Sequence, residues 1–310
     1  MGLRDEIARM LSEHPELTNR ELADLIGCSR RSARRYAGPY KERVEDITSP
    51  EQPAKILLFD IETSPMEVYT WSLFMKGYLP IDNIIKDWSV LSWAAKWLFE
   101  VDIMSEVVSP KDAQKRKDHT IIEGMWHLLN DADIVVAHNG AKFDVRKINA
   151  RFIANGLAPP MPYRVIDTMK VAKKSFAMSS FKLDYLNGFF ELPRKIHTEF
   201  QLWIDCVTGS EEALNEMVTY NRQDVVALEE LYLHLRPWIK SHPNVALYQD
   251  TEESLCANCG SRHLSWGGHY YTPVGKYAAF RCVSCGAVGR SRLSALTTEQ
   301  RKRLLTSVAN

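Results

Sequence analysis

Strand-like and helix-like segments alternate over the central part of the chain, from residue 55 to about residue 240. Apolar runs typical of strands are "KILLFDIE" (55–62), "WSVLSWAAKWL" (88–98), "VDIMSEVV" (101–108) and "DIVVAHN" (133–139). Helical spacing of apolar residues occurs in "HTIIEGMWHLLNDA" (119–132), "FDVRKINARFIANG" (143–156) and "EEALNEMVTYNRQDVVALEELYLHLRPW" (211–238). This alternation predicts an α/β domain, with a mixed sheet flanked by helices.

Charge is unevenly distributed along the chain. The 310 residues have a formal net charge of zero, but residues 255–310 contain eight Lys or Arg and one Asp or Glu. The remainder of the chain is therefore acidic overall. An acidic central part and a basic end suggest catalytic or metal-binding carboxylates in one place and contact with a polyanion in another.

Membrane and secretion signals are missing from the sequence. No apolar run approaches the roughly 20 residues of a membrane span, and the N-terminus has no apolar signal-peptide stretch. We expect no membrane partner and a cytoplasmic location, either in a cell or in a phage-infected host.

Two carboxylates end the first predicted strand. Because side chains alternate across a strand, Asp60 and Glu62 point to the same side. A divalent cation such as Mg²⁺ or Mn²⁺ would relieve the repulsion between two like charges this close. The alternative is a pair of solvated carboxylates at the end of a strand.

Further acids lie later in the chain. Asp144 begins a predicted helix after the turn in "HNGAKFD", and Tyr220 and Asp224 are four residues apart, hence on one face of the long helix. Taken singly, Asp144 fits a charge that favours the helix dipole, Tyr220 a core aromatic and Asp224 a surface acid. Their occurrence together in this order argues against coincidence.

These residues match a known pattern. Asp60-x-Glu62 on a first strand, Asn139 and Asp144 in "HNGAKFD", and Tyr220-x-x-x-Asp224 on a late helix resemble the three motifs of the DEDD 3′–5′ exonucleases. The tyrosine makes the pattern similar to the DEDDy branch, which includes the proofreading domains of family B DNA polymerases. "FKLDYLNGFFEL" (181–192) resembles the segment between their second and third motifs. The resemblance covers roughly residues 55–235.

The resemblance implies an RNase H-like fold and two-metal hydrolysis of phosphodiester bonds by a 3′–5′ exonuclease. Asp60, Glu62 and Asp224 would hold one Mg²⁺ or Mn²⁺, and Asp60 with Asp144 the other. Tyr220 would orient the attacking water or help to deprotonate it. Asn139 would bind the nucleic-acid backbone or support the turn. His138 is expected to be structural.

Two other readings remain open. A transposase or RuvC-type endonuclease with an RNase H-like fold also combines carboxylates with a helix-turn-helix and a zinc ribbon, but such enzymes usually begin with a lone Asp. A non-catalytic DNA-binding regulator on a decayed nuclease scaffold is the third reading. The four acids Asp60, Glu62, Asp144 and Asp224 are all present, which disfavours decay.

Four of the six cysteines form two CxxCG pairs near the C-terminus. Cys256 and Cys259 are followed, after 22 residues, by Cys282 and Cys285. This spacing favours a tetrahedral zinc site of the zinc-ribbon type, and four protein ligands make that Zn²⁺ structural. Four free thiols are the alternative.

Basic and aromatic residues lie around the cysteines and near the N-terminus. Lys276 and Arg281 lie among aromatic residues, which suits single-stranded nucleic acid, although a small β module also needs aromatics for its own core. "LTNRELADLIGCSRRSARRYAG" (17–38) resembles a helix-turn-helix whose second helix would present arginines to DNA. A small packing or dimerisation unit is the alternative. The arginines are Arg30, Arg31, Arg34 and Arg35.

We therefore expect five regions. They are a helix-turn-helix-like module (1–40), a linker (41–54), the RNase H-like exonuclease domain (55–240), a zinc ribbon (255–290) and a basic tail (291–310). The expected partner is nucleic acid, with DNA favoured and RNA possible. No protein partner is indicated, although replication or repair machinery fits. Aromatics in "VYTWSLFMKGYLP" (68–80) would either stack on bases or pack a long loop, and the packing role is favoured.

Overall fold

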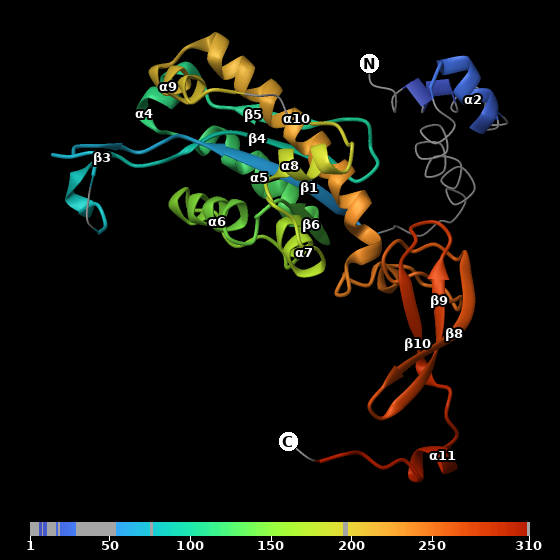
Figure 1. The fold of residues 1–310 in the computed structure, drawn as a ribbon. Coiled ribbons are helices and arrows are strands. Elements are labelled where there is room, and N and C mark those ends of the chain that lie inside the picture. Colours follow the sequence, from blue (N-terminus) through green and yellow to red (C-terminus); the bar gives the residue numbers. More distant parts are fainter. Residues whose placement is uncertain are drawn as a thin grey trace. The chain divides into compact units, whose positions relative to one another are not determined.

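The computed structural model describes residues 6–7, 9–10, 17, 19–28, 54–74, 77–194 and 198–308. The chain divides into two compact units (Figure 1). One unit comprises residues 54–243, and the other comprises residues 1–53 with 244–310. The finer division into five regions stays a prediction.

The larger unit contains a five-stranded mixed sheet, which confirms the predicted α/β class. Its strand order is β5-β4-β1-β6-β7, with β1 antiparallel to β4, β4 antiparallel to β5, and β1, β6 and β7 mutually parallel. The strands are β1 (Ile56–Thr63), β4 (Val90–Trp97), β5 (Met104–Val107), β6 (Ile134–Ala137) and β7 (Arg164–Asp167).

Helices cover the two faces of this sheet. They are α4 (Pro110–Lys115), α5 (His119–Asp131), α6 (Asp144–Ala154), α7 (Thr168–Ser175), α8 (Leu183–Phe189), α9 (Gln201–Thr208) and α10 (Glu211–Leu235), and a 3-10 turn (Arg236–Trp238) follows α10. The long helix α10 contacts β1, β4 and β5. Ser92 and Lys96 of β4 point toward α10, whereas Trp93 points to the opposite face, toward α5.

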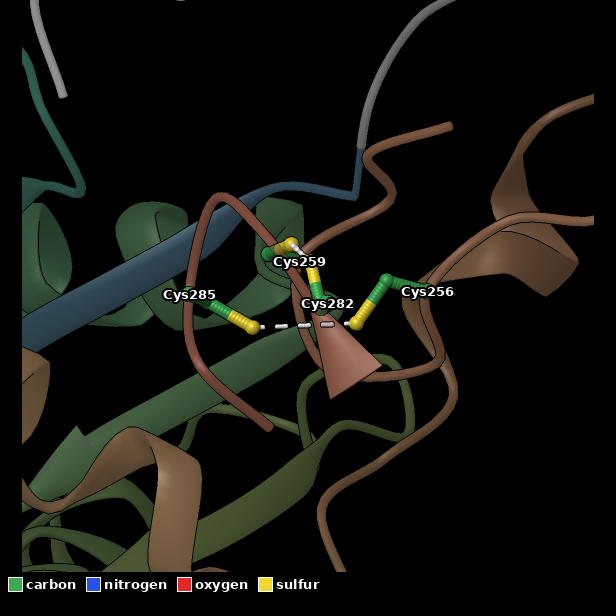
Figure 2. A group of neighbouring side chains, drawn as sticks. All are labelled: Cys256, Cys259, Cys282 and Cys285. Atoms are coloured by element: carbon green, nitrogen blue, oxygen red, sulfur yellow. Dashed lines mark hydrogen bonds between the residues drawn. The ribbon is translucent and has the colours of Figure 1, made fainter. Parts of the chain in front are cut away.

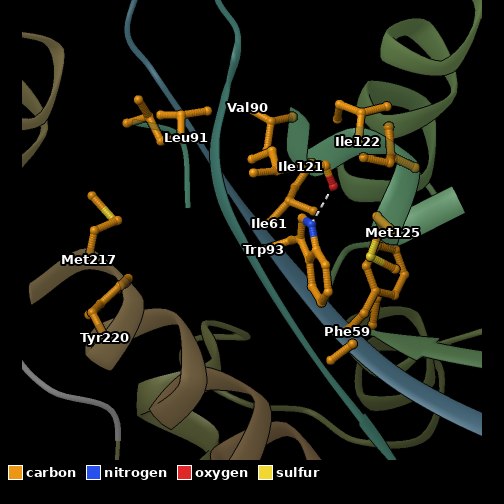
Figure 3. Close-up of a cluster of buried hydrophobic side chains, with 14 of the residues drawn as sticks. Phe59, Ile61, Val90, Leu91, Trp93, Ile121, Ile122, Met125, Met217 and Tyr220 are labelled. Atoms are coloured by element: carbon orange, nitrogen blue, oxygen red, sulfur yellow. Dashed lines mark hydrogen bonds between the residues drawn. The ribbon is translucent and has the colours of Figure 1, made fainter. Parts of the chain in front are cut away.

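The side chains between the sheet and α5 form the main core. Trp93 is buried and donates its indole N–H to the carbonyl of Ile121 at 2.6 Å, with Phe59 and Met125 beside it (Figure 3). Complete burial of side chains of this size contributes about 1.5–3 kcal/mol each. The core therefore fixes β1 from the face opposite Asp60 and Glu62.

A buried ion pair fixes α10 against the sheet. Lys96 of β4 donates to Glu229 of α10 at 2.5 Å, and both side chains are almost fully buried. Such a pair adds little net stability, because desolvation offsets the attraction, but breaking it leaves a buried charge without compensation. The pair therefore specifies how α10 lies on β4.

An arm of about 25 residues leaves the sheet at the end of β1. It contains β2 (Glu67–Val68), a 3-10 turn (Ile81–Asn83) and β3 (Ile84–Lys86). Ser64 and Ser89 close its base: the backbone N–H of Ser64 donates to the carbonyl of Ser89 at 2.9 Å, and the backbone N–H of Ser89 donates to the hydroxyl of Ser64 at 2.9 Å. Trp71, Phe74 and Tyr78 are fully or almost fully exposed. The expectation that these aromatics pack a long loop is wrong.

The smaller unit contains a three-stranded antiparallel sheet with the order β10-β9-β8. Its elements are β8 (Leu264–Thr272), β9 (Gly275–Cys282) and β10 (Val288–Ser294), with a 3-10 turn (Val245–Tyr248) before them and α11 (Thr298–Lys302) after them. The sheet thus runs past the predicted boundary at residue 290, and α11 lies within the predicted basic tail.

Near the N-terminus, α2 (Asn19–Ile26) buries Leu22 and Ala23, which pack with Ile7. Gly27 follows with φ 72°, so this turn uses a backbone conformation that glycine adopts freely. The second predicted helix, with Arg30, Arg31, Arg34 and Arg35, lies outside the described residues.

Over the part of the chain that the structure describes, no helix combines the length and apolar character needed to cross a membrane.

Candidate active site

Three predicted carboxylates meet where β1 faces α10. Asp60 and Glu62 come from β1 and Asp224 from α10, and their ligand oxygens all lie within 4.8 Å of one another. On β4 the residues opposite Asp60 and Glu62 are Ala94 and Ser92. These small side chains leave room for α10 to approach the sheet, so that Asp224 reaches the two acids of β1.

Asn221 fixes the orientation of Asp60. Its side-chain amide donates to Oδ2 of Asp60 at 2.7 Å, and its Oδ1 accepts from the hydroxyl of Ser92 at 3.0 Å. Asn221 is fully buried. Sequence reasoning missed this residue, because its contacts with Asp60 and Ser92 arise only when α10 packs on the sheet.

Asp144 lies next to this group of three without being part of it. It begins α6, is almost fully buried, and accepts a hydrogen bond from the backbone N–H of Ile61 at 3.4 Å. Burial raises the pKa of Asp144 from 3.8 to about 7, against the lowering effect of its backbone hydrogen bonds. A cation beside it would favour the ionised form.

The turn before Asp144 is held by Asp167, another residue that sequence reasoning missed. Asp167 accepts from the backbone N–H groups of Asn139 at 3.1 Å and Ala141 at 3.3 Å, and it also caps α7. Asn139 has φ 65°. At Gly140 an added Cβ would lie 2.3 Å from that of Ala137, so the turn requires glycine there.

His138 joins the turn to the next segment of chain. One ring nitrogen lies 2.8 Å from the hydroxyl of Thr168, and the other lies 2.8 Å from the carbonyl of Phe181. Both ring nitrogens therefore have partners within the fold, in keeping with the expected structural role.

Tyr220 lies one helical turn before Asp224 on α10. Its ring is buried in the main core cluster and packs edge-to-face on Trp203 of α9, with ring centroids 5.9 Å apart. The ring is thus a core aromatic as well as a neighbour of the carboxylates. A role for its hydroxyl stays a prediction.

Lys147 places a cation at the same end of β1. Its Nζ lies 3.8 Å from the ring centroid of Trp88, 4.9 Å from that of Phe143, and 3.4 Å from the hydroxyl of Thr63. Partial burial lowers the pKa of Lys147, while the nearby Asp87 and Asp144 act to raise it. This lysine was not predicted from the sequence.

The donor set of the three clustered carboxylates fits a hard divalent cation. Mg²⁺ binds oxygen at about 2.1 Å, so two of its ligand oxygens lie roughly 3–4 Å apart. The ligand oxygens of Asp60, Glu62 and Asp224 lie within 4.8 Å of one another, so small side-chain movements would bring them to these distances. These residues could therefore hold Mg²⁺ or Mn²⁺.

The four cysteines of the smaller unit form a second cluster (Figure 2). The sulfurs of Cys256 and Cys285 are 3.7 Å apart, and those of Cys259 and Cys282 are 3.5 Å apart. Tetrahedral Zn²⁺ with Zn–S bonds of about 2.3 Å places its sulfurs about 3.8 Å apart. The arrangement therefore fits a zinc module.

Two matching turns carry these cysteines. Gly260 donates its N–H to Cys256 O at 2.8 Å, and Gly286 donates to Cys282 O at 3.0 Å. Both glycines have positive φ, 77° and 76°. The glycine after each CxxC thus has the conformational role that the sequence suggested.

The family comparison concerns the larger unit. A model of the RNase H superfamily matches residues 89–236, which include Asp144, Tyr220 and Asp224. The domain has an RNase H-like fold. No curated protein matches the chain significantly.

Among solved structures, the chain is similar to the family B DNA polymerase from the hyperthermophilic archaeon Pyrobaculum calidifontis. The two share 15% sequence identity, with a TM-score of 0.42. The match covers 61% of this chain and 26% of the polymerase chain, so this chain spans about a quarter of the polymerase's length.

Proposed function

We propose that this chain is a metal-dependent 3′–5′ exonuclease that hydrolyses phosphodiester bonds of nucleic acid, with DNA favoured and single-stranded or frayed 3′ ends as substrates. The observation that carries the proposal is the meeting of Asp60, Glu62 and Asp224 within 4.8 Å, from elements far apart in the sequence. Asp144 beside them completes the set of acids.

The carboxylates would hold two Mg²⁺ or Mn²⁺ ions. Asp60, Glu62 and Asp224 would bind one, and Asp60 with Asp144 the other. Bound ions of this kind lower the pKa of water and stabilise the attacking and leaving oxygens of an in-line displacement. Asn221 keeps the Asp60 carboxylate in one orientation, so that a shared ligand does not have to be ordered during binding.

The other residues would position the reactants. Tyr220 would direct the attacking water, since lowering the pKa of that water is the task of the metal. The ammonium of Lys147, at the end of β1, suits a substrate phosphate next to the scissile bond. Asp144 must lose its proton to bind a cation, so activity is expected to fall at acid pH as this carboxylate takes up a proton.

The test is a cleavage assay on an oligonucleotide labelled at its 5′ end, with Mg²⁺ or Mn²⁺. We expect a ladder that shortens stepwise from the 3′ end and that disappears in Asp60→Ala and in EDTA. A closed circular single strand should remain intact. Internal cuts in the circle would instead establish an endonuclease, and binding without any cleavage would establish a non-catalytic DNA-binding protein.

A further inference from the structure

The sheet of the smaller unit is exposed and strongly basic. Between residues 264 and 294 it contains four basic residues and no Asp or Glu; the four are Lys276, Arg281, Arg290 and Arg292. The seven inner residues of β8 are all exposed. A surface of this kind attracts a polyanion.

The strand register separates the sheet into two different faces. Tyr270 lies opposite Tyr277 on β9, whereas the next residue, Tyr271, lies opposite Lys276. Because successive side chains alternate, Tyr270 and Tyr271 point to opposite faces. Lys276 and Arg281, five residues apart on β9, are separated in the same way. These two predicted nucleic-acid contacts therefore cannot touch the same stretch of bound strand.

One face combines tyrosine rings with arginines. The guanidinium carbon of Arg290 lies 4.0 Å from the ring centroid of Tyr277 and 5.6 Å from that of Tyr270. Tyr270 remains 52% exposed, and Arg281 is exposed on the same face. We call these four residues the tyrosine–arginine face.

On the opposite face the aromatic side chains form two neighbouring pairs. The rings of Trp266 and Phe280 lie 5.2 Å apart, and those of His269 and Tyr271 lie 6.2 Å apart. Lys276 supplies the cation there. Of these four rings only that of Phe280 is buried, so Phe280 alone fits the alternative that a small β module needs aromatics for its own core.

We propose that the tyrosine–arginine face binds single-stranded nucleic acid, with a base stacked on Tyr270 and phosphates paired with Arg281 and Arg290. Planar rings held beside guanidinium groups are suited to unpaired bases on a charged backbone. An acidic peptide would satisfy the arginines but would place no base on the tyrosine. This inference takes its class of ligand, nucleic acid, from the proposed function; the choice of face rests on the sheet itself.

The test compares neighbouring residues that differ mainly in their face. Binding of a fluorescent oligothymidylate of about 20 nucleotides is measured by anisotropy in the Asp224→Asn background, which prevents cleavage. We expect Tyr270→Ala to weaken binding about tenfold, since stacking contributes about 1–3 kcal/mol per base. Its matched control Tyr271→Ala should stay within about twofold.

Charge is tested in the same way. Arg290→Ala should weaken binding and reduce the slope of log affinity against log salt by about 0.7, as loss of one phosphate contact on a single strand does. Lys276→Ala, with the same loss of charge on the opposite face, should leave the slope unchanged. Zinc content and circular dichroism confirm that each variant keeps its fold.

Equal losses on both faces, or no loss on either, would overturn the inference. A blunt duplex has the same backbone but stacked bases, so the effect of Tyr270→Ala should vanish on it. An undiminished effect on the duplex would also contradict base stacking. Cleavage of a short oligonucleotide by the Tyr270→Ala variant with Asp224 intact reports on the carboxylates alone, so failure of either proposal can be recognised separately.

Discussion

The carboxylate cluster and the cysteine cluster are built in opposite ways. Asp60 is fixed by Asn221, which lies 161 residues later in the chain, and their meeting requires β1, β4 and α10 to be in place. Cys259 and Cys282 meet across only 23 residues, on two turns that repeat the same hydrogen bond. The carboxylates thus come together only when the sheet and α10 of the larger unit are folded, whereas the cysteines need little beyond their own turns.

The difference extends to energetics. Three carboxylates close together repel one another, so in the absence of cations their cluster costs stability that the surrounding core must supply. Structural zinc, in contrast, provides much of the folding free energy of a small module. The carboxylate cluster therefore lowers the stability of its unit, whereas the cysteine cluster would raise that of its own unit on binding zinc.

The largest expected effect comes from Asp224→Asn. Loss of this carboxylate should reduce the rate of 3′-end cleavage by about 10³-fold or more, because metal-mediated charge stabilisation is worth several kcal/mol. In metal-free buffer its thermal midpoint should equal or exceed that of the parent, since one repelling charge is gone. A large drop in the midpoint would show that the carboxylates stabilise the fold, and would contradict the view that their cluster costs stability.

The cysteine cluster should respond in the reverse manner. Cys282→Ser should abolish zinc binding and the protection of β8–β10 amides from hydrogen exchange, because the ion supplies roughly 10 kcal/mol or more to such modules. Because the carboxylates lie in the larger unit, the Cys282→Ser protein should still cleave a short oligonucleotide. Loss of that cleavage, in protein whose larger unit is still folded, would mean that the two clusters are not separable.

This contrast also explains what the sequence could predict. The cysteine turns were predictable because spacing and glycine define them locally. Asp60 and Glu62 were predictable because alternation on one strand is local too. Asn221 and Lys147 act through contacts with β1 that arise only when distant elements pack, and no local pattern distinguishes them from other polar helix residues.

Among the elements of the larger unit, the long periodic ones were the easiest to predict. The predicted segments at β1, α5 and α10 match the observed elements to within three residues at each end. The short strand β7 and helices α7–α9 were not predicted, since four to eight residues show too little periodicity. Exposure of the arm aromatics, such as Trp71, was also beyond reach, because an aromatic run has the same pattern whether it is packed or exposed.

A smaller effect is expected from a single methyl group. Gly140→Ala would place a Cβ 2.3 Å from that of Ala137, so the turn before Asp144 must shift. We expect a loss of about 1–3 kcal/mol in unfolding free energy, as for other overpacked sites, together with reduced cleavage. Urea unfolding and the 5′-label assay measure the two.

The matched control lies in the other unit. At Gly267 of β8 an added Cβ meets nothing within 4 Å. Gly267→Ala should therefore change stability by no more than about 0.5 kcal/mol and leave cleavage unaltered. Equal effects at Gly140 and Gly267 would contradict the view that the carboxylate site alone depends on tight packing.

The last prediction concerns pH and the scaffold of α10. His242 is hydrogen-bonded to the hydroxyl of Tyr232 at 2.8 Å, and its burial, with the nearby Arg236, lowers its pKa from 6.5 to about 4. Between pH 4 and pH 6.5 His242 is protonated in the unfolded chain and neutral in the folded protein. The stabilisation is complete above about pH 6.5 and is lost as the pH falls toward 4, by about 2 kcal/mol between pH 7 and pH 5.

Asp144 contributes in the opposite direction in metal-free protein. Its raised pKa means that the folded state holds a proton up to about pH 7, so its contribution to stability falls as the pH rises from about 4 to about 7. The contribution of Asp144 is the same in the parent and in His242→Gln, so the difference between the two proteins reports the contribution of His242 alone. Urea unfolding at pH 5 and pH 7 should show a difference between pH values that is about 2 kcal/mol smaller in the variant. Identical pH dependence in the two proteins would mean that His242 has the same pKa in the folded and unfolded chains, and would contradict this prediction.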